Sequence, residues 1–145
     1  MKKFAYLIVA LVLAYGFAKE QGISLPGVTQ NPGSSANAEL LQAYSRQQSN
    51  VQVAGQGVVA KVLRDDLKGS RHQKFILQIA DGPSILVAHN IDLAPRIDGL
   101  RAGDSVEFYG EYEWNNKGGV VHWTHRDPGR RHVDGWLKHQ GQTFE

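Results

Sequence analysis

From Val51 onward the sequence consists of short stretches in which apolar and polar side chains alternate, separated by turns rich in glycine. The clearest stretch is residues 71–80. In an extended chain its Phe75, Leu77 and Ile79 side chains all face the same way. A period of two is typical of a β-strand with one buried face, so this feature predicts a mainly β domain.

Five stretches of this kind are expected, and a longer connection follows the third. The predicted strands are residues 57–63, 71–80, 84–88, 105–114 and 120–124. The connection, residues 90–100, is expected to be a loop with a short helix. Five short strands with one longer connection predict a small five-stranded Greek-key barrel of the OB type. An SH3-like barrel or an open sandwich fits the same number of strands.

The segment before the strands divides into two parts. Residues 1–18 begin with two lysines and continue without a charge, which is typical of a bacterial signal peptide or of an N-terminal membrane anchor. Residues 19–50 have the composition of a linker and include a short helix that Asn37 is expected to cap. The barrel domain is expected over residues 51–145.

The location outside the cytoplasm follows from the N-terminal segment. If the segment is cleaved after Ala18, the protein is periplasmic or secreted. If it is not cleaved, the protein is held at the inner membrane, and this segment is its only expected membrane contact. No feature of the sequence indicates an obligate protein partner.

Composition excludes several kinds of site. The chain has no cysteine, which excludes disulfides, thiolate metal ligands and cysteine nucleophiles. Its formal net charge is +2 at pH 7, which is too small to indicate nucleic-acid binding by bulk charge.

The six histidines all lie between His72 and His139, and they stand close to carboxylates, arginines and tryptophans. Imidazole with a carboxylate forms an acid–base pair near neutral pH, and it is also a ligand set for a divalent metal ion. His122 and His125 face opposite sides of a continuous strand, so they share an ion only if the strand ends between them.

These considerations give three sets of candidate residues. The metal ligands are His122, His125, Asp127 and His132. The catalytic candidates are His72, His89, Glu113, His122, His125 and Asp127. The substrate-binding candidates are Arg71, Trp114, Trp123 and Arg126. Each has a structural alternative, because histidines also bond to loops, tryptophans pack, and glutamates and arginines line wet surfaces.

The polar motifs together resemble the bacterial family of unknown function designated DUF3465. They are residues 65–66, 69–73, 89–94, 110–115, 117–125, 127–128 and 135–136, together with His132. The resemblance covers roughly residues 53–144. It implies a small exported domain and brings no function with it.

Two functions remain as hypotheses. The first is a metal-dependent phosphodiesterase or nuclease, with a divalent metal ion as cofactor and nucleic acid or another phosphodiester as substrate. The second is a non-enzymatic module of the cell envelope that binds a metal or an oligomer. If neither holds, the histidines serve to satisfy buried hydrogen bonds.

Overall fold

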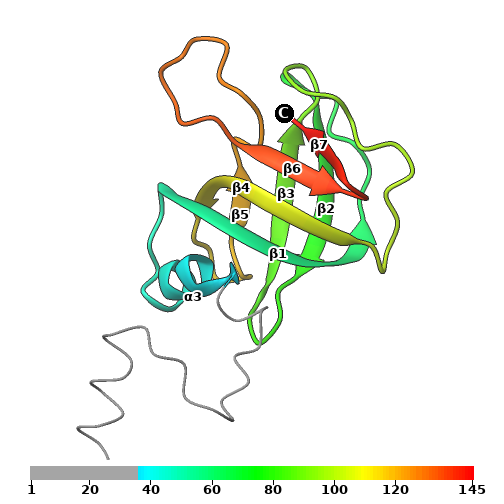
Figure 1. Ribbon diagram of the computed structural model, residues 1–145. Coiled ribbons are helices and arrows are strands. Elements are labelled where there is room, and N and C mark those ends of the chain that lie inside the picture. The colour runs from blue at the N-terminus through cyan, green and yellow to red at the C-terminus, as the bar shows by residue number, and fades with distance from the viewer. Residues whose placement is uncertain (1–35) are drawn as a thin grey trace, which may run out of the picture. The chain divides into compact units, whose positions relative to one another are not determined.

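Seven strands and one short helix make up the part of the chain described by this computed structural model, residues 36–145 (Figure 1). The elements are α3 (Ala38–Ser45), β1 (Val51–Val62), β2 (His72–Gln78), β3 (Ser84–Asn90), β4 (Ser105–Glu113), β5 (Val120–His122), β6 (Trp136–His139) and β7 (Gln142–Phe144). The predicted signal or anchor segment, residues 1–18, lies outside the described residues, as does the linker up to residue 35. No helix within residues 36–145 is long and apolar enough to cross a membrane.

Five of the strands close into a barrel. Their order is β1-β2-β3-β5-β4, and antiparallel pairing of β1 with β4 closes the ring. The β3–β5 pairing is parallel, whereas the other four pairings of the ring are antiparallel. This arrangement confirms the predicted five-stranded Greek-key barrel of the OB type, and a closed ring is not an open sandwich.

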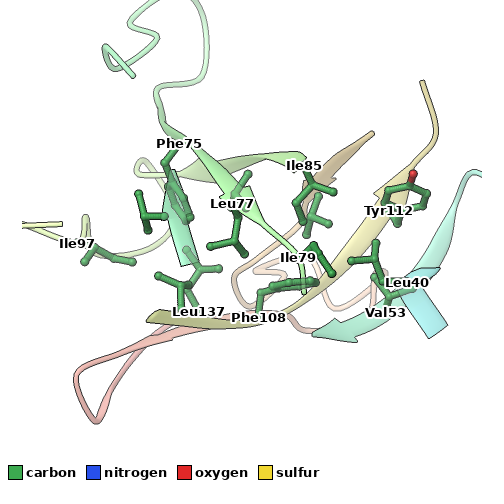
Figure 2. Packing of buried hydrophobic residues seen from close by; sticks show 14 of the residues in the cluster. Leu40, Val53, Phe75, Leu77, Ile79, Ile85, Ile97, Phe108, Tyr112 and Leu137 are labelled. Carbon is green, nitrogen blue, oxygen red and sulfur yellow. The ribbon is translucent and has the colours of Figure 1, made fainter. Parts of the chain in front are cut away.

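The core fills the inside of the barrel with side chains of alternate residues (Figure 2). Phe75, Leu77 and Ile79 are fully buried, as the alternation predicted. Helix α3 adds Leu40, which Figure 2 shows beside Val53 of β1. The inward faces are mainly apolar, with the hydrogen-bonded Gln73 and His89 as exceptions, so the accessible polar side chains lie on the outward face and in the loops.

Several boundaries differ from the predictions. Strand β1 begins at Val51 rather than at residue 57, because small and polar residues hide its alternation. The connection 90–100 contains only turns and no helix. Asn37 stands at the N-cap of α3, but its side chain makes no cap bond and instead accepts the backbone N–H of Gln56. Strands β6 and β7 were not predicted.

The remaining edge of β4 is shared by two short strands. Strand β5 pairs with residues 111–113 of β4, and β6 pairs with residues 107–109. Since β1 occupies the other edge, β5 and β6 lie one after the other along the same edge. Residues 123–135 form a loop that leaves the sheet between them, drawn in orange in Figure 1. We call it the interrupting loop.

Candidate metal centre

The outward face of β4 carries two carboxylates beside a histidine of β5. Tyr112 points into the core, so Glu111 and Glu113 on either side of it share the outward face. In the antiparallel register Glu111 lies directly opposite His122. The barrel therefore brings these three side chains together because of strand pairing alone.

The donor atoms of this cluster converge. The Nε2 atom of His122 lies 3.2 Å from Oε2 of Glu111 and 3.3 Å from Oε1 of Glu113. Donor atoms from the three residues lie within 4.8 Å of one another. Ligand atoms bound at ~2.1 Å to one ion lie roughly 3–3.5 Å apart, so these separations suit a shared cation.

The contacts of His122 Nε2 do not have the geometry of hydrogen bonds. Although two carboxylate oxygens are within 3.3 Å, this buried nitrogen has no hydrogen-bond partner among the described residues. Buried polar atoms rarely lack a hydrogen-bond partner, and a bound ion is one explanation for such a case. A cation between the nitrogen and the two carboxylates provides one.

A second histidine reaches the cluster from the interrupting loop. Nε2 of His132 lies 3.5 Å from Oε1 of Glu111, the oxygen that does not face His122. Its Nδ1 lies 2.8 Å from the backbone oxygen of Val133 and donates its proton there, since a carbonyl only accepts. In the neutral ring Nε2 then carries the lone pair, which is the arrangement of a metal-binding histidine. We therefore count His132 as the fourth candidate ligand.

Asp127 holds the interrupting loop in shape. Its carboxylate accepts the backbone N–H groups of Gly129, Arg131 and His132 at 2.8–2.9 Å. These hydrogen bonds, that from Arg131 first, lower the pKa of Asp127 and keep it ionised. Both oxygens thus fix the backbone that positions His132, although the sequence suggested Asp127 as a ligand or a base.

Trp123 marks the point where β5 ends. It adopts a left-handed backbone conformation with φ of 57°, and the strand ends at His122, two residues before the predicted end at Thr124. Its indole stacks on the His132 ring at 3.9 Å between centroids and 9° between planes. Such a backbone costs roughly 1–3 kcal/mol for a bulky residue, and strain of this kind gathers at functional sites. Trp123 supports a candidate ligand, and the substrate-binding role predicted for it is untested.

The structure places three of the predicted histidines outside the cluster. His89 is fully buried, with Nδ1 at 2.7 Å from Thr124 Oγ1 and Nε2 at 2.9 Å from the Pro95 oxygen. Burial lowers its pKa to about 4. His125 bonds through Nδ1 to the Arg126 oxygen, and His72 through Nδ1 to the oxygen of Ser70.

Three of the four predicted substrate-binding residues are engaged elsewhere. Arg71 forms an ion pair with Asp92, with 2.7 Å between Nε and Oδ1. Arg126 forms an ion pair with the C-terminal residue Glu145. Trp114 is partly buried against the core cluster. None of the three is near enough to the carboxylates of β4 to form a contact that the structure records.

Glu111 is the central residue of the cluster, and the sequence did not single it out. The turn at residues 115–119 makes the predicted fourth and fifth strands a hairpin, but it does not fix their register. Pairing the predicted strand ends, residues 114 and 120, places Tyr112 opposite His122, whereas the observed pairing of Glu113 with Val120 places Glu111 there. Glu111 belongs to the polar motif at residues 110–115, but residue type alone did not place it among the candidate residues.

Comparison with known proteins identifies a family. The family model described as protein of unknown function, DUF3465, matches residues 23–145. A search of curated proteins finds no match.

Proposed function

Because the chain belongs to the DUF3465 family, whose function is unknown, we propose a function from the geometry of its site: binding of a divalent transition-metal ion. The ligands are Glu111, Glu113 and His122, with His132 as a fourth. The observation that carries the proposal is the buried His122 Nε2, which faces two carboxylate oxygens without forming a hydrogen bond to either.

The donor set indicates the class of metal. Imidazole nitrogens suit zinc, copper, nickel and iron, whereas magnesium and calcium prefer sites made only of oxygen ligands. Two carboxylates and two imidazoles offer two donors of each kind. We therefore expect Zn²⁺, Ni²⁺ and Cu²⁺ to bind, and Mg²⁺ to bind far more weakly.

Calorimetric titration of the purified protein tests this expectation. One equivalent of Zn²⁺ should bind, and Glu111→Gln should weaken its affinity at least ~100-fold because a ligand oxygen and a negative charge are lost. Glu107→Gln is the matched control, since Glu107 lies on the same face of β4 but outside the cluster. Equal Zn²⁺ affinities for wild type and Glu111→Gln would remove the proposed centre.

A metal-dependent phosphodiesterase or nuclease is the second proposal, and one observation favours it. Arg130 and Arg131 lie in the interrupting loop with His132, and neither forms a salt bridge within residues 36–145. Guanidinium groups without a carboxylate partner, in the loop that carries a candidate metal ligand, suit a phosphodiester. Against it, Arg71 and Arg126 are already paired with carboxylates.

Incubation with plasmid DNA and with RNA distinguishes the two proposals. If the protein is a hydrolase, Zn²⁺ or Mn²⁺ should support cleavage, and EDTA should stop it. If calorimetry shows metal binding but the nucleic acid stays intact under every metal condition, the hydrolase proposal is wrong and only metal binding remains.

We also propose that the protein acts outside the cytoplasm, where residues 1–18 would direct it as a signal peptide or an anchor. Fractionation of cells, followed by mass determination of the recovered protein, would separate a cleaved periplasmic form from an uncleaved membrane-bound one.

A further inference from the structure

Within residues 36–145, two buried side-chain polar atoms have no hydrogen-bond partner. They are Nε2 of His122 and Nε2 of Gln52. The first belongs to the proposed metal centre. The second is an amide nitrogen on β1, which no part of that proposal uses.

Both atoms belong to residues that flank Glu111. In the sheet Gln52 pairs with Glu111 across β1 and β4, and Glu111 pairs with His122 across β4 and β5. The neighbour of Gln52, Val53, is fully buried in the core, so the Gln52 side chain leaves the other face of β1. Directly opposite residues have Cβ atoms ~5 Å apart. Gln52, Glu111 and His122 thus form one row on the outward face.

The chemistry of the amide limits what can satisfy it. Nε2 of glutamine only donates hydrogen bonds, so its partner has to offer an acceptor. A bare cation offers none. A donor that is buried without a partner lowers stability, which makes a ligand carrying an acceptor at this place favourable.

An oxygen bound to the metal ion meets this requirement. The three ligands whose donor atoms converge, Glu111, Glu113 and His122, leave a position for an exogenous ligand, and a centre that also takes His132 accommodates one by becoming five-coordinate. We propose that this position takes a small oxyanion such as a carboxylate, and that Gln52 holds it by donating from Nε2. Water would occupy the position when no anion is present. This inference rests on the proposed metal site and extends it to a ternary one.

The experiment uses Co²⁺, whose visible absorption reports its ligands, and acetate as the oxyanion. Acetate should change the spectrum of the Co²⁺-loaded wild-type protein in a saturable way. Gln52→Leu should bind Co²⁺ within about 3-fold of wild type but acetate roughly 10-fold more weakly, because the donor is lost. Gln56→Leu is the matched control: Gln56 shares this face of β1 and pairs with Glu107, so its acetate affinity should stay that of wild type.

The outcomes separate this inference from the proposal on which it rests. Failure of the wild type to bind Co²⁺ would overturn both. Binding of Co²⁺ with the same acetate affinity in wild type and Gln52→Leu would overturn the role of Gln52, and a wild-type spectrum that acetate does not change would overturn the oxyanion position. The proposed metal centre would stand in both cases. A stability measurement in EDTA adds an independent test. Gln52→Leu should melt a few degrees higher than wild type, because it removes a buried donor that has no partner. A lower melting temperature would contradict the claim that the Gln52 amide is unsatisfied.

Discussion

Gly135→Ala is expected to destabilise the domain by about 3 kcal/mol, near the upper end for overpacking substitutions. A Cβ atom at Gly135 would lie 2.0 Å from the backbone oxygen of Trp123 and 2.5 Å from that of Tyr109. Both are backbone atoms, so no rotamer change relieves the contact. Unfolding in urea measures the loss, which corresponds to a melting temperature lower by roughly 10–20 °C.

The same substitution should weaken metal binding, since Gly135 closes the base of the interrupting loop. Its N–H donates to the oxygen of His125 at 2.8 Å, and the loop carries His132. Gly129→Ala is the matched control within the loop. Its Cβ would meet nothing closer than 3.4 Å, so its stability should stay within ~0.5 kcal/mol of wild type. Equal stabilities for the two variants would contradict this prediction, because they would show that the backbone at the base of the loop moves enough to accommodate a Cβ atom at Gly135.

Acidification from pH 7 to 4.5 is expected to reduce the free energy of unfolding by about 2 kcal/mol through His89 alone. Burial lowers the pKa of this histidine from 6.5 to about 4 in the folded protein. The unfolded chain therefore takes up the proton first. The contribution of His89 to the free energy of unfolding is fully present above pH 6.5. It decreases as the pH falls from 6.5 towards 4 and changes little below that.

His89→Gln should remove most of this loss, because glutamine stays neutral over the whole range. Urea unfolding in EDTA at both pH values gives the comparison, and His72→Gln, in which His89 remains, should keep the loss. The carboxyls of Asp92, Asp104 and Asp127 have pKa values lowered by the hydrogen bonds they accept, so their contribution is lost mainly below this window. A pH dependence that is unchanged in His89→Gln would contradict the assignment.

The sequence predicted the barrel because alternation reports which side of a strand is buried. In β2 and β4 the apolar residues recur at every second position, and their faces were correct. Over residues 51–57 of β1 the outward residues Gln52, Ala54 and Gln56 alternate with two valines and two glycines, so little apolar signal is left. Strands β6 and β7 are four and three residues long, too short for a period to be recognised.

The candidate site was predicted only in part, since it depends on register rather than on periodicity. His122 and Glu113 were recognised as candidates by residue type. His132 was also named as a ligand, but nothing in the sequence indicated that it would approach Glu111. That approach depends on the folding of the interrupting loop around Asp127. The buried environment of His89 was also invisible, because its partners Thr124 and Pro95 come from two separate connections.

The interruption between β5 and β6 has a consequence for protein engineering. The two ends of the loop pair with Glu111 and Tyr109, which are only two residues apart on β4, so the barrel fixes where the loop is attached but not how long it is. A segment of different length and composition can replace residues 126–134 while the buried Thr124 and His125 and the closely packed Gly135 stay in place. Such exchanges would vary the position of His132, the fourth ligand of the proposed metal centre, without redesigning the scaffold.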